Sequence, residues 1–171
     1  MTRFAIDPQR SRVWIDARSS LHPIHSEVTG VTGWFEADVQ GGGRVNPTVP
    51  VRAHVELDVA NLSSGNALYD REMRRRINAR QFPTISGDID TMKENDQGRY
   101  SVSGLVTFRG ESRPATGEVA LSMSEDRSLR IEGSHTFDVR DFGMEPPRIL
   151  TLRVYPDVDV KVAFVAREEG S

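Results

Sequence analysis

The chain has 171 residues, of which 37% are hydrophobic and 27% are charged, and its formal net charge is −3. These values favour a single soluble globular domain over residues 1–171, and they disfavour a disordered or membrane-spanning chain. The mild negative charge gives no basis for nucleic-acid binding, and the lack of cysteine excludes disulfides, thiol catalysis and thiolate-bound metals. The N-terminus begins with no apolar run of signal-peptide length, so we expect a cytoplasmic protein.

β-strands are the first elements that the residue pattern predicts. Early strands are expected near residues 12–19 and 26–39. The clearest alternation spans residues 51–59, where every odd position is apolar and every even position is polar. A half-buried strand has this period of two, because its successive side chains point to opposite faces.

Residues 67–80 depart from this period. Tyr69, Met73 and Ile77 recur every four residues, which places them on one side of an α-helix. Asn66 stands where an N-cap residue is expected, and a Phe-Pro pair follows the segment. The pattern therefore predicts one short helix over residues 67–80.

Alternation resumes after the predicted helix. It spans residues 84–92, 100–108, 115–123, 129–139 and 158–166, and most of these runs are separated by polar turns of hairpin length. About eight antiparallel strands with one helix indicate an all-β fold, either an up-and-down β-barrel or a β-sandwich. A closed eight-stranded barrel has no exposed edge and has room for one small ligand.

Four glycines share the inward phase of the later strands: Gly87, Gly104, Gly117 and Gly133. Each replaces a core side chain by a hydrogen, and gaps at similar heights on neighbouring strands would outline an apolar tunnel. A hydrocarbon ligand would restore the missing contacts. The alternative is that the glycines let the strands bend as the barrel closes.

Several motifs in this chain resemble the YceI-like lipid- and polyisoprenoid-binding family, over about residues 4–166. They are Phe4-Ala5-Ile6-Asp7 with Ser11-Arg12-Val13, the glycine-punctuated run 29–35, the helix segment 65–71 continuing to 81–85, the hairpin 102–110 with Arg113-Pro114, and the loop 141–144. The chain departs from the family pattern in a shorter stretch between the helix and Pro83, in Arg71 after Asp70, and in the turn 22–25.

The resemblance implies a lipocalin-like eight-stranded antiparallel β-barrel and does not imply catalysis. We therefore expect neither enzymatic activity nor a cofactor. The implied ligand is amphipathic, such as a polyprenyl chain or an isoprenoid quinone held in the barrel. Together with the inward phase of the strands, it predicts a set of ligand-contacting residues and neither catalytic nor metal-binding ones. The predicted contacts are Val55, Leu57, Met73, Ile77, Ile85, Gly87, Ile89, Val102, Gly104, Val106, Phe108, Gly117, Val119, Leu121, Ile131, Gly133, His135, Phe137 and Phe142.

The histidines give weaker signals. His22 and His25 have an HxxH spacing, but Pro23 lies between them, so we expect solvated turn residues rather than a metal site. His135 shares the inward phase and is either the one polar contact to a ligand head group or a core histidine bound to backbone or water. His54 falls on the polar face of its strand and is expected at the surface.

The predicted helix also carries a basic cluster, formed by Arg71, Arg74, Arg75, Arg76 and Arg80. This cluster is either a solvated helix face or a site for an anionic head group or a transient membrane contact. If the helix caps the barrel mouth, its apolar side would plug the mouth while the arginines point outward.

Two tryptophans, Trp14 and Trp34, fall on the outward phase of their strands. Large aromatic side chains on an outer surface are typical of a protein–protein contact, so this pattern predicts a homodimer.

Together these patterns predict a soluble carrier or sensor that transports an isoprenoid-like lipid. Two alternatives are an enzyme that acts on a small amphipathic substrate through His135 and a neighbouring carboxylate, and an interaction module whose barrel is filled by its own side chains. The sequence has no phosphate loop, nucleophile elbow, HExxH motif or dinucleotide fingerprint, which favours the binding protein.

Overall fold

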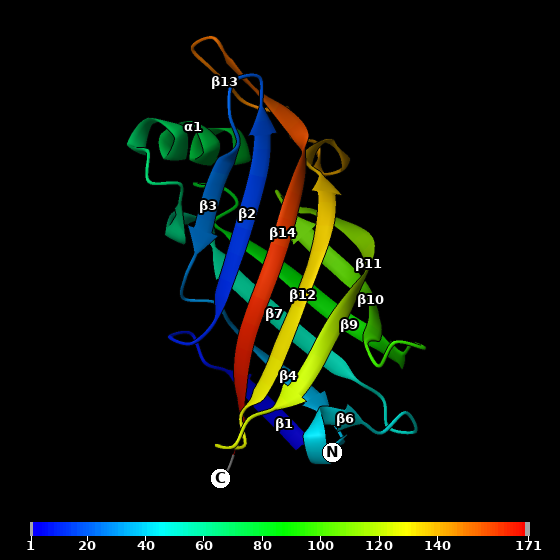
Figure 1. Ribbon diagram of the computed structural model, residues 1–171. Coiled ribbons are helices and arrows are strands. Elements are labelled where there is room, and N and C mark those ends of the chain that lie inside the picture. Colours follow the sequence, from blue (N-terminus) through cyan, green and yellow to red (C-terminus); the bar gives the residue numbers. More distant parts are fainter. Residues whose placement is uncertain (1, 170–171) are drawn as a thin grey trace.

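The computed structural model describes residues 2–169, which form antiparallel β-strands and one α-helix (Figure 1). A closed barrel of 8 strands confirms the predicted all-β fold class. The last strand pairs with the first and closes the circle. In order of pairing, the barrel strands are β1 (Thr2–Ile6), β4 (Thr32–Ala37), β7 (Arg52–Asp58), β9 (Thr84–Glu94), β10 (Tyr100–Phe108), β11 (Glu111–Met123), β12 (Leu129–Asp138) and β14 (Leu152–Glu168).

Strands β9 to β12 form a meander of successive hairpins. β10 and β11 pair from Tyr100 opposite Val119 to Phe108 opposite Glu111, so only two residues form the turn between them. These residues, Arg109 and Gly110, have φ angles of 54° and 73°. A tight hairpin turn needs positive φ at both central positions, and its twist matches that of the flanking strands.

Strand β14 has two successive neighbours along one of its edges. Its C-terminal part pairs with β1, and its earlier part pairs with β2 (Arg12–Ser19). β2 is followed in the sheet by β3 (Ile24–Val28) and then by β8 (Leu62–Ser63). The wall of the barrel is therefore completed by β2, β3 and β8 toward the end where α1 lies, and by β1 and β4 toward the end where both chain termini lie (Figure 1).

The remaining elements are short and lie at the two ends of the barrel (Figure 1). At the end with the termini, β5 (Val39–Gln40) and β6 (Arg44–Val45) form a hairpin around the 3₁₀ turn η1 (Gly41–Gly43). At the other end lie the 3₁₀ turns η2 (Val59–Asn61) and η3 (Val139–Phe142) and the strand β13 (Arg148–Ile149), which pairs with the start of β14.

Helix α1 (Ala67–Ile77) begins as predicted and ends earlier than predicted. The Asn66 side chain accepts hydrogen bonds from the backbone N–H groups of Leu68 and Tyr69, which confirms its role as N-cap. Asn78 has a φ of 60°, and its N–H bonds to carbonyl groups of the last turn. A left-handed residue ends an α-helix, so the helix stops before residues 78–80. No helix within residues 2–169 is long and apolar enough to cross a bilayer.

The prediction of one strand over residues 26–39 is wrong. The segment is divided between β3, β4 and β5. Between β3 and β4 lies Gly30, whose φ of 75° turns the chain out of the extended conformation. Buried apolar residues occur on both sides of this break, but their spacing changes there, because Val28 and Val31 are both fully buried and lie three residues apart.

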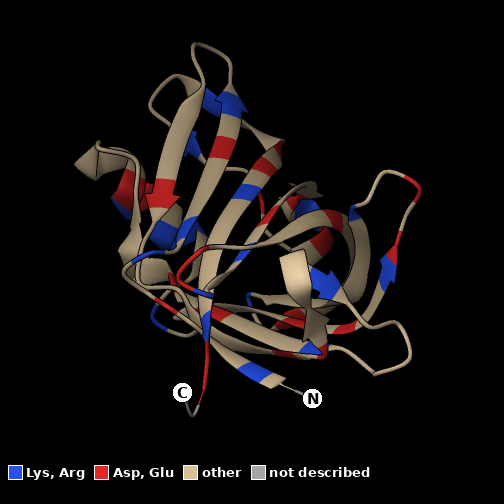
Figure 2. Cartoon of the chain, turned by 60° about the horizontal axis from the view of Figure 1, so that its bottom comes forward, with Lys and Arg blue, Asp and Glu red and all other residues tan. Residues whose placement is uncertain are grey.

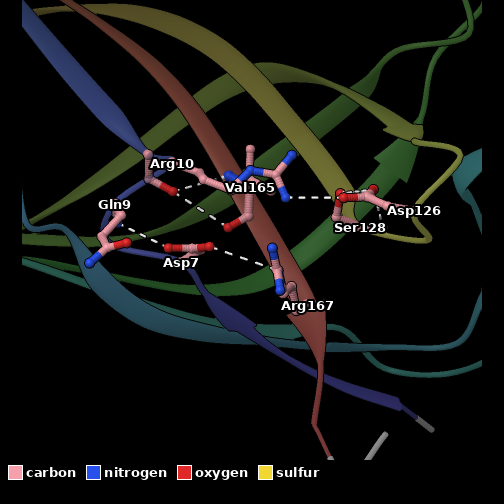
Figure 3. A network of polar contacts seen from close by, with 8 residues as sticks. Asp7, Gln9, Arg10, Asp126, Ser128, Val165 and Arg167 are labelled. Carbon is pink, nitrogen blue, oxygen red and sulfur yellow. Dashed lines mark hydrogen bonds and ion pairs between the residues drawn. The ribbon is translucent and has the colours of Figure 1, made fainter.

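The end with the chain termini is packed with the protein's own side chains. Leu129 is fully buried there among Phe4, Phe35 and Phe164, and the Tyr100 hydroxyl accepts a hydrogen bond from the Val45 N–H at 3.0 Å. Polar contacts connect the surrounding turns (Figure 3). They link Arg10 to Asp126, Asp126 to Ser128, and Arg167 to Asp7.

Charged residues occur as separate bands of both signs along the strands (Figure 2). Every second residue of a barrel strand faces outward, so such bands are expected where the inner face is apolar. The inner face consequently decides what the barrel can hold.

Candidate ligand-binding cavity

A cavity of about 340 Å³ lies inside the barrel. Its wall is formed by β2, β7, β9, β10, β11, β12 and β14, and the inward side chains of these strands are almost all aliphatic or aromatic. Phe35 and Phe164 are among the residues that belong both to the packed core and to the cavity lining, so the cavity adjoins the core. The volume falls at the lower end of the roughly 300–1,000 Å³ that is typical of small-molecule sites.

Two acidic residues on the lining strands direct their carboxylates away from the cavity. Asp88 Oδ1 lies 2.7 Å from Nδ1 of His54, on the outer face of the sheet. Glu118 contacts Arg99 Nε at 3.5 Å and accepts a hydrogen bond from Asn95 Nδ2 at 3.1 Å. The cavity wall is therefore apolar, which suits a hydrocarbon and suits a sugar or phosphate poorly.

All four inward glycines line the cavity, as their phase predicts. They form two pairs, which differ in whether a Cβ atom would fit at the position. A Cβ atom at Gly87 would come no closer than 4.0 Å to another atom, the carbonyl oxygen of Leu105. A Cβ atom at Gly117 would come no closer than 3.8 Å, to Nδ1 of His135. A Cβ atom at either position would make only ordinary van der Waals contacts, and both positions line the cavity, so their missing side chains enlarge it.

The other two glycines are needed for close approach of neighbouring strands. A Cβ atom at Gly104 would lie 1.9 Å from the carbonyl oxygen of Asp88, where the pairing of β9 and β10 shifts register. A Cβ atom at Gly133 would lie 2.8 Å from the carbonyl oxygen of Glu118. The strand-bending alternative therefore describes Gly104 and Gly133, and the cavity interpretation describes Gly87 and Gly117.

Helix α1 and η3 cover the upper end of the cavity. Met73 and Ile77 of α1 belong to the cavity lining, which is the arrangement expected if the helix caps the barrel mouth. Val139 and Phe142 of η3 complete this roof together with Met144. Methionine side chains adapt to irregular spaces, so this roof can adjust to different occupants.

Every residue predicted to contact a ligand lies on the cavity wall except Leu121. Leu121 packs against the core cluster. The cavity lining also includes apolar residues that the prediction omitted. The local residue pattern could not identify them, because it does not contain the order of the strands around the barrel. The omitted residues are Val13, Ile15, Phe35, Ala53, Leu62, Met92, Ala115, Val139, Met144, Val158, Val160, Val162 and Phe164.

His135 lines the cavity and is also exposed. Its ring contacts the ring of Phe137 edge-on, with 4.6 Å between centroids. Among residues 2–169, no carboxylate and no other group forms a hydrogen bond with this imidazole. The neighbouring Asp138 accepts a hydrogen bond from the Arg140 side chain at 2.7 Å. Hydrogen bonds from the side chain and then from the backbone of Arg140 lower the pKa of Asp138.

The other histidines lie outside the cavity. His22 Nε2 is 3.2 Å from the Tyr69 hydroxyl, and His25 Nδ1 is 2.6 Å from Asp16 Oδ1, so the two imidazoles contact different partners. Both are exposed, as predicted, but only His22 lies in the turn, because His25 is part of β3. In the described part of the chain, no three His, Asp or Glu side chains are grouped to hold a metal ion.

The arginines of α1 and its flank differ in their contacts. Arg75 lies 3.4 Å from Glu72, and Arg76 lies 3.9 Å from Glu145. Within residues 2–169, Arg71, Arg74 and Arg80 have no ion-pair partner within 4.0 Å. Only part of the predicted basic cluster is therefore neutralised by acidic residues.

The two tryptophans lie on the outer face, as predicted, and each is covered by a cation. The Arg3 guanidinium lies 4.5 Å from the ring centroid of Trp34, and Lys161 Nζ lies 5.6 Å from that of Trp14. Such contacts are favourable for exposed aromatic rings. They account for both tryptophans within one copy of the chain.

Solved structures with the same architecture occur at low sequence identity. BcnA of Burkholderia cenocepacia is 17% identical, with 94% of this chain and 98% of its own covered and a TM-score of 0.75. A polyisoprenoid-binding domain of Saccharophagus degradans is 9% identical, with 98% and 99% covered and a TM-score of 0.74. The YceI protein of Campylobacter jejuni is 13% identical, with 80% and 82% covered and a TM-score of 0.59.

No curated protein has significant similarity to this chain. The family model of the YceI-like domain, in contrast, matches residues 4–166. This span includes the whole cavity lining and all of the barrel strands except the first two residues of β1 and the last two of β14. The chain therefore belongs to the YceI-like family.

Proposed function

We propose that the protein is a non-catalytic carrier of an apolar amphipathic lipid, an isoprenoid or isoprenoid quinone, which it holds in the barrel. The apolar cavity of about 340 Å³ carries this proposal. A tail that buries about ten methylene-sized groups would contribute roughly 8 kcal/mol before ordering costs, so it needs no hydrogen bond to bind. The polyisoprenoid-binding domain of S. degradans, which has the same fold, supports this ligand class.

No observation favours the enzyme alternative to the same degree. That alternative requires His135 to act with a carboxylate, and within residues 2–169 no carboxylate is hydrogen-bonded to it. The alternative of a barrel filled by its own side chains is not supported, because a cavity of about 340 Å³ lies inside the barrel.

Native mass spectrometry of protein purified without detergent tests the proposal, before and after addition of a short-tailed isoprenoid quinone. We expect one bound lipid or quinone per chain. Gly117→Leu should lower quinone affinity at least about tenfold, because its first side-chain carbon has room beside His135 and the rest extends into the cavity. Ser122→Leu, at an exposed position of the same strand outside the cavity lining, is the matched control and should bind like the wild type.

Absence of any bound lipid together with no uptake of the quinone would contradict the carrier proposal. Unchanged quinone binding by Gly117→Leu would contradict the location of the site. Circular dichroism and thermal unfolding of both variants show whether the barrel is intact.

The end of the barrel at α1 also supports a transient membrane contact, through which the carrier would load. Leu150 is 86% exposed at the β13–β14 turn, and Leu21 is 71% exposed at the β2–β3 turn. The two turns are adjacent, since the Ser20 N–H donates to the Arg153 carbonyl at 2.9 Å. Leu150 also has a φ of 55°, which is unfavourable for a leucine and keeps its side chain at the tip.

Basic residues surround these leucines. Arg71, Arg148 and Arg153 are exposed, and within the described residues none has an ion-pair partner within 4.0 Å. Apolar tips among arginines fit an anionic bilayer, in which leucine enters the interface and arginine binds lipid phosphate.

Co-sedimentation with vesicles tests this contact. Wild-type protein should bind vesicles that contain phosphatidylglycerol more than vesicles of phosphatidylcholine alone. The double substitution Leu21→Ser and Leu150→Ser should reduce binding at least severalfold, whereas Leu105→Ser, at a 48% exposed leucine on the barrel wall, should not. Equal loss in both variants, or no binding by the wild type, would contradict the contact.

Two further predictions concern the assembly and the compartment. A homodimer through Trp14 and Trp34 is tested by light scattering of the wild type and of Trp14→Ser. The cytoplasmic location stays a prediction that fractionation of cells can test.

A further inference from the structure

The wall of the barrel is incomplete between β11 and β12. The two strands pair from Met123 opposite Leu129 to Glu118 opposite Ser134 and no further. Both continue beyond that pair, β11 with β10 as its neighbour and β12 with β14 as its neighbour. At the end near η3 the gap is bridged again, because Arg113 Nε donates to the Asp141 carbonyl at 2.9 Å. We call the stretch between these two contacts, over which β11 and β12 are not paired, the lateral slot.

The lateral slot is continuous with the cavity. Ala115 and Gly117 on β11 and His135 and Phe137 on β12 belong to the two strand segments that border the slot, and all four residues also line the cavity. His135 is exposed there, and its ring lies beside Gly117, where an added Cβ atom would be 3.8 Å from Nδ1. An occupant of the cavity can therefore extend a head group into the slot.

The polar groups at the slot suit a neutral head group. The His135 imidazole has a ring N–H and no hydrogen-bond partner among residues 2–169. Toward the slot, the backbone of β11 over residues 111–117 has no strand partner, so further hydrogen-bonding groups are available. Both kinds of group can bind a carbonyl or hydroxyl oxygen.

The charges near the slot disfavour an anionic head group. Arg113 is already held by the Asp141 carbonyl and by Glu111 Oε2 at 3.2 Å. Arg109 is held by the carbonyl groups of Phe142 and Gly143. A diphosphate would find no free arginine at this point and would lie near acidic residues of the same rim.

We propose that the lateral slot is the head-group site of the carrier and that it selects a neutral oxygen-bearing head group, with His135 donating a hydrogen bond to that oxygen. The tail lies in the cavity beneath α1. This inference rests on the proposed function and narrows its ligand to prenols, quinones and similar neutral lipids, in preference to prenyl diphosphates.

Three probes with the same fifteen-carbon skeleton test the proposal: farnesol, farnesyl diphosphate and the hydrocarbon farnesane, each supplied from cyclodextrin and measured by competition in native mass spectrometry. Wild-type protein should bind farnesol about tenfold more tightly than farnesane, the expected effect of one hydrogen bond. It should bind farnesyl diphosphate at least about tenfold more weakly than farnesol.

Substitutions at His135 give the second part of the test. His135→Phe should lower the affinity for farnesol about tenfold and leave that for farnesane unchanged, because only the hydrogen bond is lost. His135→Gln keeps an N–H donor and should retain most of the preference. His54→Phe, on the outer face of β7, is the control and should change neither affinity.

The outcomes separate this inference from the carrier proposal. If no probe binds, the carrier proposal itself fails. If all three bind but farnesyl diphosphate is preferred, or if His135→Phe weakens all three equally or none, the head-group site is wrong while the carrier proposal stands.

Discussion

The two halves of this barrel use the same alternation of residues for opposite purposes. At the end with the chain termini, inward side chains such as Leu129, Phe4 and Tyr100 fill the space between the strands. Toward α1, the same inward phase contains Gly87 and Gly117, and the space stays open. The packed half therefore contributes most of the van der Waals contacts that stabilise the fold. The other half has fewer such contacts, and the space that this leaves is the candidate binding site.

The packed half should be the more sensitive to loss of a side chain. Leu129→Ala should lower the free energy of unfolding by roughly 4 kcal/mol, because Leu129 is fully buried and its removal leaves a new cavity. Leu57→Ala is the matched change at the cavity wall and should cost at least about 1 kcal/mol less, since Leu57 already faces open space on one side. Urea denaturation of both variants measures this difference, and equal losses would contradict the comparison.

A second contrast lies within the inward glycines. Gly104→Ala should destabilise by roughly 2 kcal/mol or more, because its methyl group would collide with the Asp88 carbonyl and force β9 and β10 apart. Urea denaturation measures this change as well. An unchanged free energy of unfolding would show that β9 and β10 can separate without destabilising the fold.

Gly87→Ala should have the opposite sign. Its methyl group meets no atom within less than 4.0 Å, so the change should stabilise the fold by about 0.4–1 kcal/mol through the lower entropy of the unfolded chain. A destabilisation comparable to that of Gly104→Ala would mean that Gly87 does not face open space.

The smallest expected effect concerns the polar network at the packed end (Figure 3). Hydrogen bonds from the side chain and then the backbone of Ser128 are the main causes that lower the pKa of Asp126 from 3.8 to about 2. A carboxylate with a lowered pKa stabilises the folded state above its unfolded pKa, and this contribution is lost as the pH falls through about 2.

Asp126→Asn should therefore reduce the melting temperature slightly at pH 7 and have less effect as the pH falls below about 3. Glu125→Gln, in the same turn and exposed, is the control. A difference between Asp126→Asn and the wild type that stays constant over this pH range would contradict the role of the charge.

Much of the fold could be predicted because local patterns determine it. Period-two alternation identified most barrel strands, and the spacing of Tyr69, Met73 and Ile77 together with Asn66 located the helix. The errors fall where single residues take a left-handed conformation. Gly30 interrupts a run that still looks like a strand, and Asn78 ends the helix within an apparently helical segment.

The candidate site was predictable in part. The inward phase identified the wall and all four glycines, because it depends only on alternation along each strand. The register between strands determined the rest. It decides that Gly104 and Gly133 are required by a neighbouring backbone, and that β11 and β12 separate beyond Ser134 to leave the lateral slot. Neither fact follows from residues that are adjacent in the chain.

The most direct test of the central claim is a crystal structure of protein purified without detergent and soaked with a short-tailed isoprenoid quinone. We expect continuous electron density within the barrel, between Gly87 and Gly117 and beneath Met73 and Ile77. An interior filled by the protein's own side chains, with the quinone absent or bound only to the outer surface, would contradict it.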